Sequence, residues 1–596
     1  MQSYYTGTSA MAAIISEKFR IFNAKQFLES LSEGASDADA ARTRMYFFVG
    51  RSSKWDAYLE MFNVSGTFQV GETVSGGGFS GVVAAVYDNS LLLNTILPTP
   101  TTTPAFGTTI TGGTSGATAK SGVYRYGTED VPPMPLDNYS EKRSVYEELI
   151  AAKRVTGPFA RLVVPRYNWN LALNPKFDMY RPNYSPTPGG GGAIGVETAL
   201  GSTSLSNSKF YVMNSAYEVF KCLYNGEGPA NPTGQNATYE PSSQPSAGQG
   251  TFANGVYTEP SGTAGYIWKH MFTLGTSDVL SFLSSDFMPI AAASDPSRTA
   301  VEALAVDGAV HVAVIRDAGT GLPASQTLYT SVIGDGTGAV IEFTTDGSGS
   351  LATAKLVAAG SGYTYGNVIL ETGKVFTDQA LTAAAGAFGG TASLEAVISP
   401  EGGHGSNADD ELFSKRVMTN IRLTYDEGQG DFPVDNDFRR IGIIQDPLEY
   451  GTSTFASSST LRGTSVLKVN GATADYVADE TISQTVSGGT AYGTVVSWDS
   501  ANGILKYFQS AALHTHEGKV LAFESDASNA VVGVTSTASG TVDTAQNAVL
   551  SDISFTGGLA TPELEPNSGE IVYIENRREI TRAPDQIEDI KLVLEF

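Results

Sequence analysis

The residues that could do chemistry in this chain are few and scattered. There is one cysteine, Cys222, and among the five histidines only His514 and His516 lie close together. On a strand, residues two positions apart point to the same face, so these two rings could begin a zinc site. No cysteine and no second histidine cluster completes the ligand set. We therefore expect His514 and His516 to lie in a surface loop without a metal.

Cys222 lies in an apolar run that is typical of a strand, between Lys221 and Leu223. A lone cysteine can act as a nucleophile, but free cysteine more often behaves as a small buried hydrophobe. We expect a buried packing role. A single cysteine allows no intramolecular disulfide, which fits assembly in a reducing cytoplasm.

Three further stretches resemble ligand-binding loops only superficially. The acidic residues between 426 and 437 lack the alternating oxygen spacing, the central glycine and the terminal glutamate of an EF-hand. Gly189–Gly192 lacks the Lys-Ser/Thr pair of a phosphate-binding loop, and Gly334–Gly338 has no basic residue beside it. We interpret all three as turns or solvated loops.

Hydrolytic chemistry has little support in the sequence. The Gly-Ser-Gly triplets around Ser348 and Ser361 lack the Gly-x-Ser-x-Gly spacing of a nucleophile elbow. The paired carboxylates of a glycoside hydrolase are set in space rather than in sequence, so that alternative stays open. The sequence predicts no catalytic residue, no metal site and no cofactor.

Composition favours many short strands. The chain has 596 residues, 65 of them glycine, and Ser and Thr crowd the same segments. Such a mixture predicts a mainly β, multi-domain protein with a few short helices. The net charge of −25 disfavours nucleic acid and anionic membranes as partners. Neither a targeting segment nor a membrane span is expected, because no apolar run is long enough.

Two helices are predicted. The first begins at Asn23 as N-cap, with Phe22 and Phe27 placed to form a hydrophobic staple. The second runs from about 141 to 154, with Ser140 as its cap and a stop at Gly157.

Strands and loops should alternate elsewhere. Strands are expected at Met45–Val49 and at Arg161–Val164, and residues 265–274, which include Trp268, must be buried. Residues 181–209 are rich in Pro, Gly and Ser and are predicted to be a loop, and residues 225–263 are again polar and turn-rich.

Three stretches, at 64–130, 300–400 and 460–560, are rich in Gly, Thr, Ser, Val and Ala and predict small β modules. The first and third share a weak repeat, since Glu72-Thr73-Val74 followed by Ser75-Gly76-Gly77 resembles Glu480-Thr481-Ile482 and a later Ser-Gly-Gly. Residues 109–113 are a possible partial third copy. The predicted domains are 1–63 (helix plus strand), 64–130 (β module), 131–299 (core β domain), 300–400 (Gly-rich β module), 401–459 (core segment), 460–560 (β module) and 561–596 (C-terminal core strands).

Between these modules, short motifs occur in a fixed order from one end of the chain to the other. The clearest are Ser568–Arg577 and Phe438-Arg439 with Pro447-Leu448-Glu449. Earlier motifs surround Arg51 and Arg166. The motif positions that we single out are Arg51, Trp55, Pro165, Arg166, Trp169, Trp268, Arg439, Pro447, Glu570, Glu575, Asn576 and Arg577.

These motifs resemble the baseplate wedge subunit of T-even-like contractile-tailed phages, the gene product 8 family. The resemblance implies a β-sandwich-like core into which the three β modules are inserted. It also implies a homodimer or two copies per wedge, and a place in the virion tail baseplate after assembly in the host cytoplasm. The implied partners are the gene product 6, 7 and 10 types of wedge protein. No enzymatic residue is implied. The charged motif residues either form internal ion pairs and carbonyl contacts or reach a partner.

Two other functions stay open at this stage. The Gly/Thr/Ser-rich modules display loops well, which suggests a receptor- or glycan-binding tail protein. An envelope-degrading hydrolase is supported only by carboxylates whose positions in space are unknown.

Overall fold

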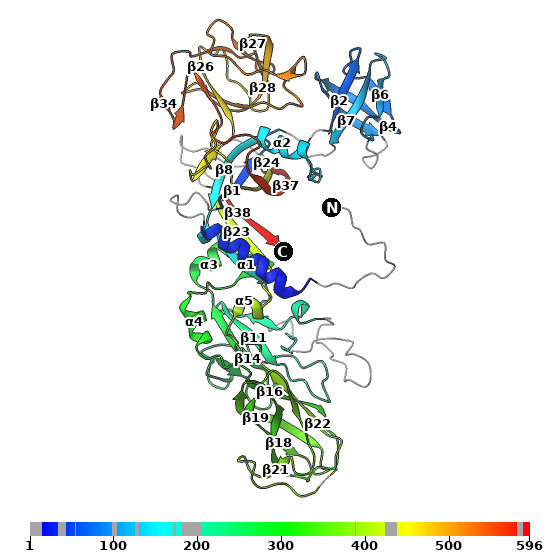
Figure 1. The fold of residues 1–596 in the computed structure, drawn as a ribbon, viewed down its shortest axis with the longest axis vertical. Helices are drawn as coiled ribbons and strands as arrows, with labels where there is room; N and C mark the ends of the chain where they lie inside the picture. Colours follow the sequence, from blue (N-terminus) through cyan, green and yellow to red (C-terminus); the bar gives the residue numbers. More distant parts are fainter. Residues whose placement is uncertain are drawn as a thin grey trace. The chain divides into compact units, whose positions relative to one another are not determined.

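The computed structural model is mainly β, which confirms the predicted fold class (Figure 1). Strands account for 43% of it and helices for 10%, and the strands form several sheets and barrels. The described residues are 15–33, 43–53, 55, 57–97, 104–125, 130–170, 175–181, 204–387, 389–423, 438–580 and 588–596.

The chain divides into two units, each assembled from segments that are distant in sequence. Unit 1 comprises Met1–Leu28, Ala160–Asn420 and Lys591–Phe596. Unit 2 comprises Glu29–Phe159 and Ile421–Ile590.

A five-stranded antiparallel sheet forms the centre of unit 2, in the order β25-β8-β1-β24-β37. β1 lies between β8 and β24, and all of its residues are buried. Because both faces are covered, the strand is a continuous apolar run without polar alternation. The bounds are β1 Met45–Gly50, β8 Leu149–Val155, β24 Phe438–Gln445, β25 Thr460–Arg462 and β37 Glu570–Ile580.

Helix α2 (Tyr139–Glu147) packs against this sheet. The predicted helix of about 141–154 is wrong in its second half, which forms β8. A short apolar run fits a strand as well as a helix. Here the residues form a strand because they pair with β1 and β25. The N-cap is Asn138 rather than Ser140, since the Asn138 side chain accepts a hydrogen bond from the Glu141 amide at 2.8 Å.

The first inserted module in unit 2 is a closed six-stranded barrel (Figure 1). Its order is β2-β5-β4-β3-β6-β7, and its interior is filled by apolar side chains such as Leu59, Phe79 and Ile110. It begins at Ala57, before the predicted 64, because β2 is required to close it. The bounds are β2 Ala57–Ser65, β3 Thr73–Gly76, β4 Phe79–Val86, β5 Ser90–Leu97, β6 Thr109–Gly112 and β7 Thr118–Arg125.

The third inserted module contains a second barrel of the same kind. Its order is β29-β28-β27-β32-β33-β26, and β26 also pairs with β29, which closes the ring. Strand for strand this is the order of the first barrel, so the predicted repeat is confirmed. The bounds are β26 Ser465–Asn470, β27 Thr481–Val486, β28 Gly489–Asp499, β29 Ile504–Phe508, β32 Val531–Gly533 and β33 Ser539–Val542; short strands nearby are β30 Thr515–His516, β31 Lys519–Val520, β34 Val549–Leu550, β35 Ile553–Ser554 and β36 Leu559–Ala560.

A buried glutamate occupies the same place in both barrels. Glu72 and Glu480 each accept three backbone N–H bonds and one serine hydroxyl bond, at 2.7–3.0 Å. The carboxylate thereby ties the start of one hairpin to the turn of another. The donors are Gln69, Thr114 and Ser115 for Glu72, and Val477, Thr535 and Ser536 for Glu480.

Residues 109–113 are not a third copy of the repeat, because Thr109–Gly112 is strand β6 of the first barrel itself. Its Gly112 corresponds to Gly533 of the third module. A Cβ at either glycine would lie 2.7 Å from both carboxylate oxygens of the buried glutamate, so only glycine leaves room for that side chain.

Unit 1 contains a five-stranded sheet, β10-β11-β14-β13-β12, and a four-stranded sheet, β15-β9-β23-β38. Trp268, Phe220 and Cys222 are fully buried in its main core. The bounds are β9 Ala160–Pro165, β10 Tyr211–Met213, β11 Glu218–Tyr224, β12 Thr251–Ala253, β13 Val256–Thr258, β14 Ile267–Thr273, β15 Phe287–Pro289, β23 Arg416–Leu423 and β38 Glu588–Glu595. A 3-10 turn lies at Leu205–Asn207, and another, at Gly157–Phe159, ends the first segment of unit 2.

The middle module also belongs to unit 1. A β16–β22 ladder adjoins the sheet β19-β18-β17-β20, with β21 paired to β17, around a separate apolar core. The bounds are β16 Val310–Asp317, β17 Thr327–Gly334, β18 Thr337–Thr345, β19 Leu351–Ser361, β20 Gly366–Val368, β21 Val375–Phe376 and β22 Ser393–Ile398.

The first helix begins earlier than predicted. α1 runs from Glu17 to Glu33, and Ser16 lies at its N-cap position, with its Oγ 3.3 Å from the Phe19 amide. Asn23 is therefore inside the helix, and Phe22 is exposed instead of forming a staple. The other helices are α3 Thr276–Phe282, α4 Pro296–Glu302 and α5 Ala408–Glu411.

Within the described residues, no helix combines the length and the apolar character that crossing a membrane requires. The acidic stretch 426–437 and Gly189–Gly192 lie outside the described residues.

Candidate functional site

Several motif residues meet in one buried cluster of unit 2, centred on Arg440. The Arg440 guanidinium lies 2.7 Å from Glu141 Oε1 and 3.1 Å from Glu148 Oε2. It also donates to Asn576 Oδ1 at 3.0 Å and to the Ser144 hydroxyl at 2.9 Å. Glu141, Ser144 and Glu148 come from α2 and the residue after it, so the cluster fastens α2 to β24 and β37.

Trp55 completes this Arg440 cluster. The Arg51 and Arg440 guanidinium carbons lie 4.2 and 5.5 Å from the Trp55 ring centroid. Such cation–π contacts are favourable, the more so where water is excluded. The Trp55 Nε1 donates to the Arg577 carbonyl at 2.7 Å. Arg577 thus participates through its backbone, while its side chain lies 3.5 Å from Glu575 at the surface.

Arg51 lies at an unusual backbone angle, with φ +57°. Contacts from Glu148 hold it there, because the Glu148 carbonyl accepts from the Arg51 amide at 2.8 Å and Glu148 Oε1 lies 2.7 Å from Arg51 Nη1. Arg439 donates its amide to the Arg51 carbonyl at 3.1 Å, and its guanidinium bonds the Ser52 carbonyl. Left-handed backbone at a non-glycine residue costs about 1 kcal/mol or more, and persists only where the surroundings over-determine it.

The Arg440 cluster can hold elements together but cannot act on a substrate. Arg440 and Arg439 have almost no accessible surface. The buried carboxylates of Glu141 and Glu148 are both paired with arginine. Two other motif positions lie in unit 2. The Pro447 carbonyl accepts a hydrogen bond from the Ala456 amide at 2.8 Å, and Glu570 is the first residue of β37.

The unit 1 motif residues form two further contacts. Pro165 ends β9, and the Arg166 guanidinium donates to the Ser284 carbonyl at 2.6 Å. Trp169 stacks on Phe177 at 6.0 Å between ring centroids, and Phe177 meets Trp268 edge to face at 5.1 Å. The tryptophans therefore serve a common apolar core, and Arg166 binds a loop carbonyl.

Sequence reasoning missed a second buried charged group, in unit 1. Lys221 forms an ion pair with Glu411, and its ammonium lies 4.8 Å from the Tyr180 ring centroid. Burial lowers the pKa of Lys221, although Glu411 opposes this. The Lys221 side chain has no accessible surface, so no substrate can reach its amine. The lysine within the otherwise apolar run of β11 is the sequence feature that indicates such a buried pair.

Two histidines adjoin this pair. The His404 ring lies 4.9 Å from the Tyr180 ring and 5.0 Å from the His311 ring. Burial lowers the pKa of His404 well below its ordinary value and that of His311 to about 4, with the nearby lysines contributing. Both rings are therefore neutral near pH 7 and act as packing groups.

Cys222 and His514 are buried as well. Burial raises the pKa of the Cys222 thiol well above its ordinary value, so it is a packing residue, as expected, and not a nucleophile. The surface loop predicted for His514 is wrong, because this ring is buried against Phe508 and Thr494, on strands β29 and β28. Among the described residues, no three His, Cys, Asp or Glu side chains are grouped to hold a metal.

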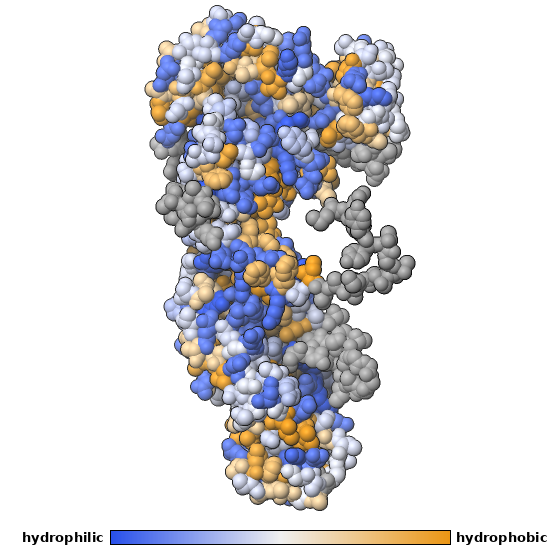
Figure 2. All heavy atoms as spheres, in the orientation of Figure 1, coloured by the Kyte–Doolittle hydropathy of each residue, from blue (hydrophilic) through white to orange (hydrophobic). Residues whose placement is uncertain are grey.

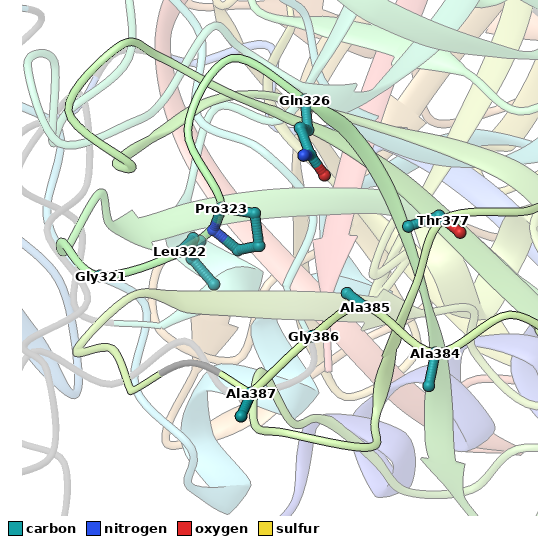
Figure 3. A pocket seen from close by; sticks show the side chains of 9 residues that line it. All are labelled: Gly321, Leu322, Pro323, Gln326, Thr377, Ala384, Ala385, Gly386 and Ala387. Carbon is teal, nitrogen blue, oxygen red and sulfur yellow. The ribbon is translucent and has the colours of Figure 1, made fainter.

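The middle module has an open pocket of about 560 Å³. Figure 3 shows that its lining consists mostly of glycine, alanine and other small apolar residues, with Gln326 and Thr377 as the polar side chains. None of the lining residues titrates near neutral pH, so this pocket offers no general acid or base.

Exposed apolar side chains are the best candidates for contact with other proteins. In unit 2, Val131, Met134, Leu136 and Tyr139 are all exposed within nine consecutive positions, Met134 by 85%. In Figure 2 hydrophobic side chains occur on the drawn face as patches among hydrophilic ones. Contiguous exposed apolar groups commonly mark interaction sites. On α1 and just before it, Ile15, Phe19 and Phe22 are exposed at helical spacing.

Comparison with known proteins adds no relative to these observations. No protein-family model matches the chain, and no curated protein matches it. The resemblance to a wedge subunit therefore depends on the sequence motifs alone.

Proposed function

We propose that this chain is a structural subunit of a phage tail baseplate wedge. It would be assembled in the host cytoplasm, act in the virion, and bind wedge proteins of the gene product 6, 7 and 10 types. Two copies per wedge, or a homodimer, are part of the proposal. The role requires shape, apolar anchors and satisfied polar groups, and no catalysis.

One observation carries this proposal. Arg51 and Trp55, Arg439, and Asn576 and Arg577 come from three motifs separated by hundreds of residues, yet they form one contact network. Chance matches to short motifs would be scattered over the fold. Residues that define a shared family core are expected to meet, because they are retained for their mutual contacts.

The chemistry of the described residues is consistent with a scaffold. The charged motif side chains Arg51, Arg166 and Arg439 bind carboxylates or carbonyls of the same chain. Partner binding would then fall to exposed apolar segments such as Val131–Tyr139. The motif residues would then maintain the fold, and the exposed apolar segments would bind the neighbouring wedge proteins.

Cross-linking mass spectrometry on intact virions tests the proposal. Lys18 is the best probe, since its side chain is 83% exposed, and Lys142 is a second at 42%. Lys591 donates to the Leu283 carbonyl at 2.9 Å and should react more slowly. Links from Lys18 and Lys142 to other wedge proteins are expected. Links only to fibre proteins, or none to the baseplate, would reject the wedge assignment.

A further inference from the structure

The second barrel carries a surface hollow of about 470 Å³ at one end of β26 and β29. This volume lies in the range of roughly 300–1,000 Å³ that small-ligand sites occupy. Its hydrogen-bonding side chains come from the exposed loop residues Asp475, Ser500 and Asn502. Lys468 and Asn470 on β26 and the ring of Trp498 complete the lining.

Trp498 is fixed in position. Its Nε1 donates to Asp475 Oδ1 at 2.9 Å, and its ring meets the buried Tyr476 edge to face at 5.0 Å between centroids. The tryptophan stays partly exposed at the hollow. A rigid, half-exposed aromatic ring held by a carboxylate is a preorganised contact surface.

Three polar atoms around the hollow make no hydrogen bond within the described part of the chain. Asp475 uses Oδ1 for Trp498, which leaves Oδ2 as an acceptor. Asn470 Oδ1 accepts from Lys468 at 2.9 Å, which leaves the Asn470 amide as a donor. The Asn502 amide donates to Asp499 at 2.7 Å, which leaves Asn502 Oδ1 as an acceptor. The hollow thus offers both donors and acceptors beside an aromatic ring.

The first barrel provides an internal comparison. Val83 and Val495 are equivalent, because each donates its amide to the carbonyl of the buried glutamate at 2.9 Å. Three residues later, the first barrel has Val86 where the second has Trp498. The segment that supplies Asp475 is also longer, since 471–479 in the second barrel replaces 66–71 in the first. The barrel fold therefore requires neither the tryptophan nor the aspartate.

The lining indicates the class of ligand. Lys468 and Asp475 balance in charge, so an ionic ligand has no net attraction to the hollow. A sugar ring combines an apolar C–H face, which fits against an aromatic ring, with hydroxyls that both donate and accept hydrogen bonds. A purely apolar ligand would leave the carboxylate and amides unsatisfied.

We propose that this hollow is a binding subsite for an uncharged pyranose unit, with Trp498 as the platform and Asp475, Asn470 and Asn502 as hydroxyl partners. The subsite goes beyond the scaffold role and does not depend on it. A wedge subunit with or without this property would give the same cross-links.

Saturation-transfer difference NMR on the full chain tests the subsite with the methyl glycosides of glucose, galactose, mannose and N-acetylglucosamine as probes. At least one should bind in the millimolar range, with its ring C–H protons receiving the strongest transfer. Trp498→Val, which installs the residue of the first barrel, should weaken binding about tenfold, the effect expected for loss of one aromatic contact.

Matched variants separate binding from folding. Asp475→Ala and Asn502→Ala change exposed loop residues and should weaken the same probe, whereas Val534→Ser, an exposed change elsewhere in this barrel, should leave it unchanged. If Trp498→Val lowers the melting temperature, its weaker binding no longer separates a lost contact from a damaged fold. The binding of Asp475→Ala and Asn502→Ala then tests the proposal. Absence of transfer to all four glycosides, or equal binding by wild type and both loop variants, would overturn the proposal.

Discussion

At the scale of single residues, the equivalent glutamates Glu72 and Glu480 show how a buried carboxylate stabilises each barrel. Burial raises the pKa of Glu480, but hydrogen bonds from Ser536, Val477 and Thr535 outweigh it and the net pKa lies below the ordinary value. The same balance lowers the pKa of Glu72. In both barrels the carboxylate is therefore charged at neutral pH and is a fixed part of the fold.

Glu480→Gln should destabilise the second barrel by about 2–4 kcal/mol, because an amide NH₂ would face N–H donors and leave them unsatisfied. Hydrogen exchange of the amides in residues 531–542 measures the effect. Glu517→Gln makes the same charge change at an exposed position of this module and should leave exchange unaltered. Equal protection in the two variants would mean that the Glu480 carboxylate does not stabilise the barrel.

His514 makes the second barrel sensitive to acid. Its Nδ1 accepts from the Ser510 amide at 2.8 Å, so the proton is on Nε2, which lies 2.9 Å from Thr494 Oγ1. Burial lowers the pKa of His514 to about 4. An unfolded histidine has a pKa of about 6.5. Between these values the unfolded chain binds the proton and the folded barrel does not.

Stability of the second barrel should therefore fall as the pH decreases from about 6.5 to 4, by about 3 kcal/mol in total, and the His514 contribution should level off below pH 4. Thermal unfolding of the wild type and His514→Gln across this range measures the difference. His516→Gln is the control, and its pH dependence should resemble that of the wild type. A His514→Gln profile as steep as that of the wild type would contradict the tautomer and burial described.

At the scale of elements, Arg440 fastens α2 to the central sheet. Arg440→Met would remove the cation that pairs with the buried Glu141 and Glu148 and should cost about 3–5 kcal/mol, the usual penalty for breaking a buried pair. Urea unfolding followed by tryptophan fluorescence, to which Trp55 beside Arg440 contributes, measures it.

The matched control is Arg422→Met. Arg422 pairs with Asp589 at 2.8 Å, but its side chain is 55% exposed. Exposed pairs contribute about 1 kcal/mol or less. If both variants lost the same stability, the contacts of Arg440 would contribute no more than a surface pair.

At the scale of the whole molecule, function is expected to depend on exposed apolar segments. Met134→Asp places a charge in the exposed segment Val131–Tyr139 and should reduce co-purification with wedge partners by tenfold or more, since about 1.4 kcal/mol is lost per factor of ten. The fold should survive because Met134 is 85% exposed. Val70→Asp, another exposed apolar position in unit 2, is the control and should bind normally. Equal binding by both variants would place the interface elsewhere.

The sequence by itself determined the mainly β class, the strands Met45–Val49 and Arg161–Val164, the burial of Cys222 and the repeat of Glu72 at Glu480. These features depend on local pattern, because an apolar run between turn residues has few alternatives to a strand. The repeat was visible because the same carboxylate and glycine-rich turn are needed wherever this barrel is built.

Tertiary structure alone decided the rest. Residues 149–154 pair with neighbouring strands and so do not continue α2, and β2 joins the first barrel because ring closure needs a sixth strand. The Arg440 cluster and the Lys221–Glu411 pair combine residues that are far apart in sequence, and the hollow beside Trp498 forms only when the ends of several strands of one barrel meet. No local pattern encodes which charges will meet, because the energy of a buried ion pair depends on geometry that only the complete fold supplies.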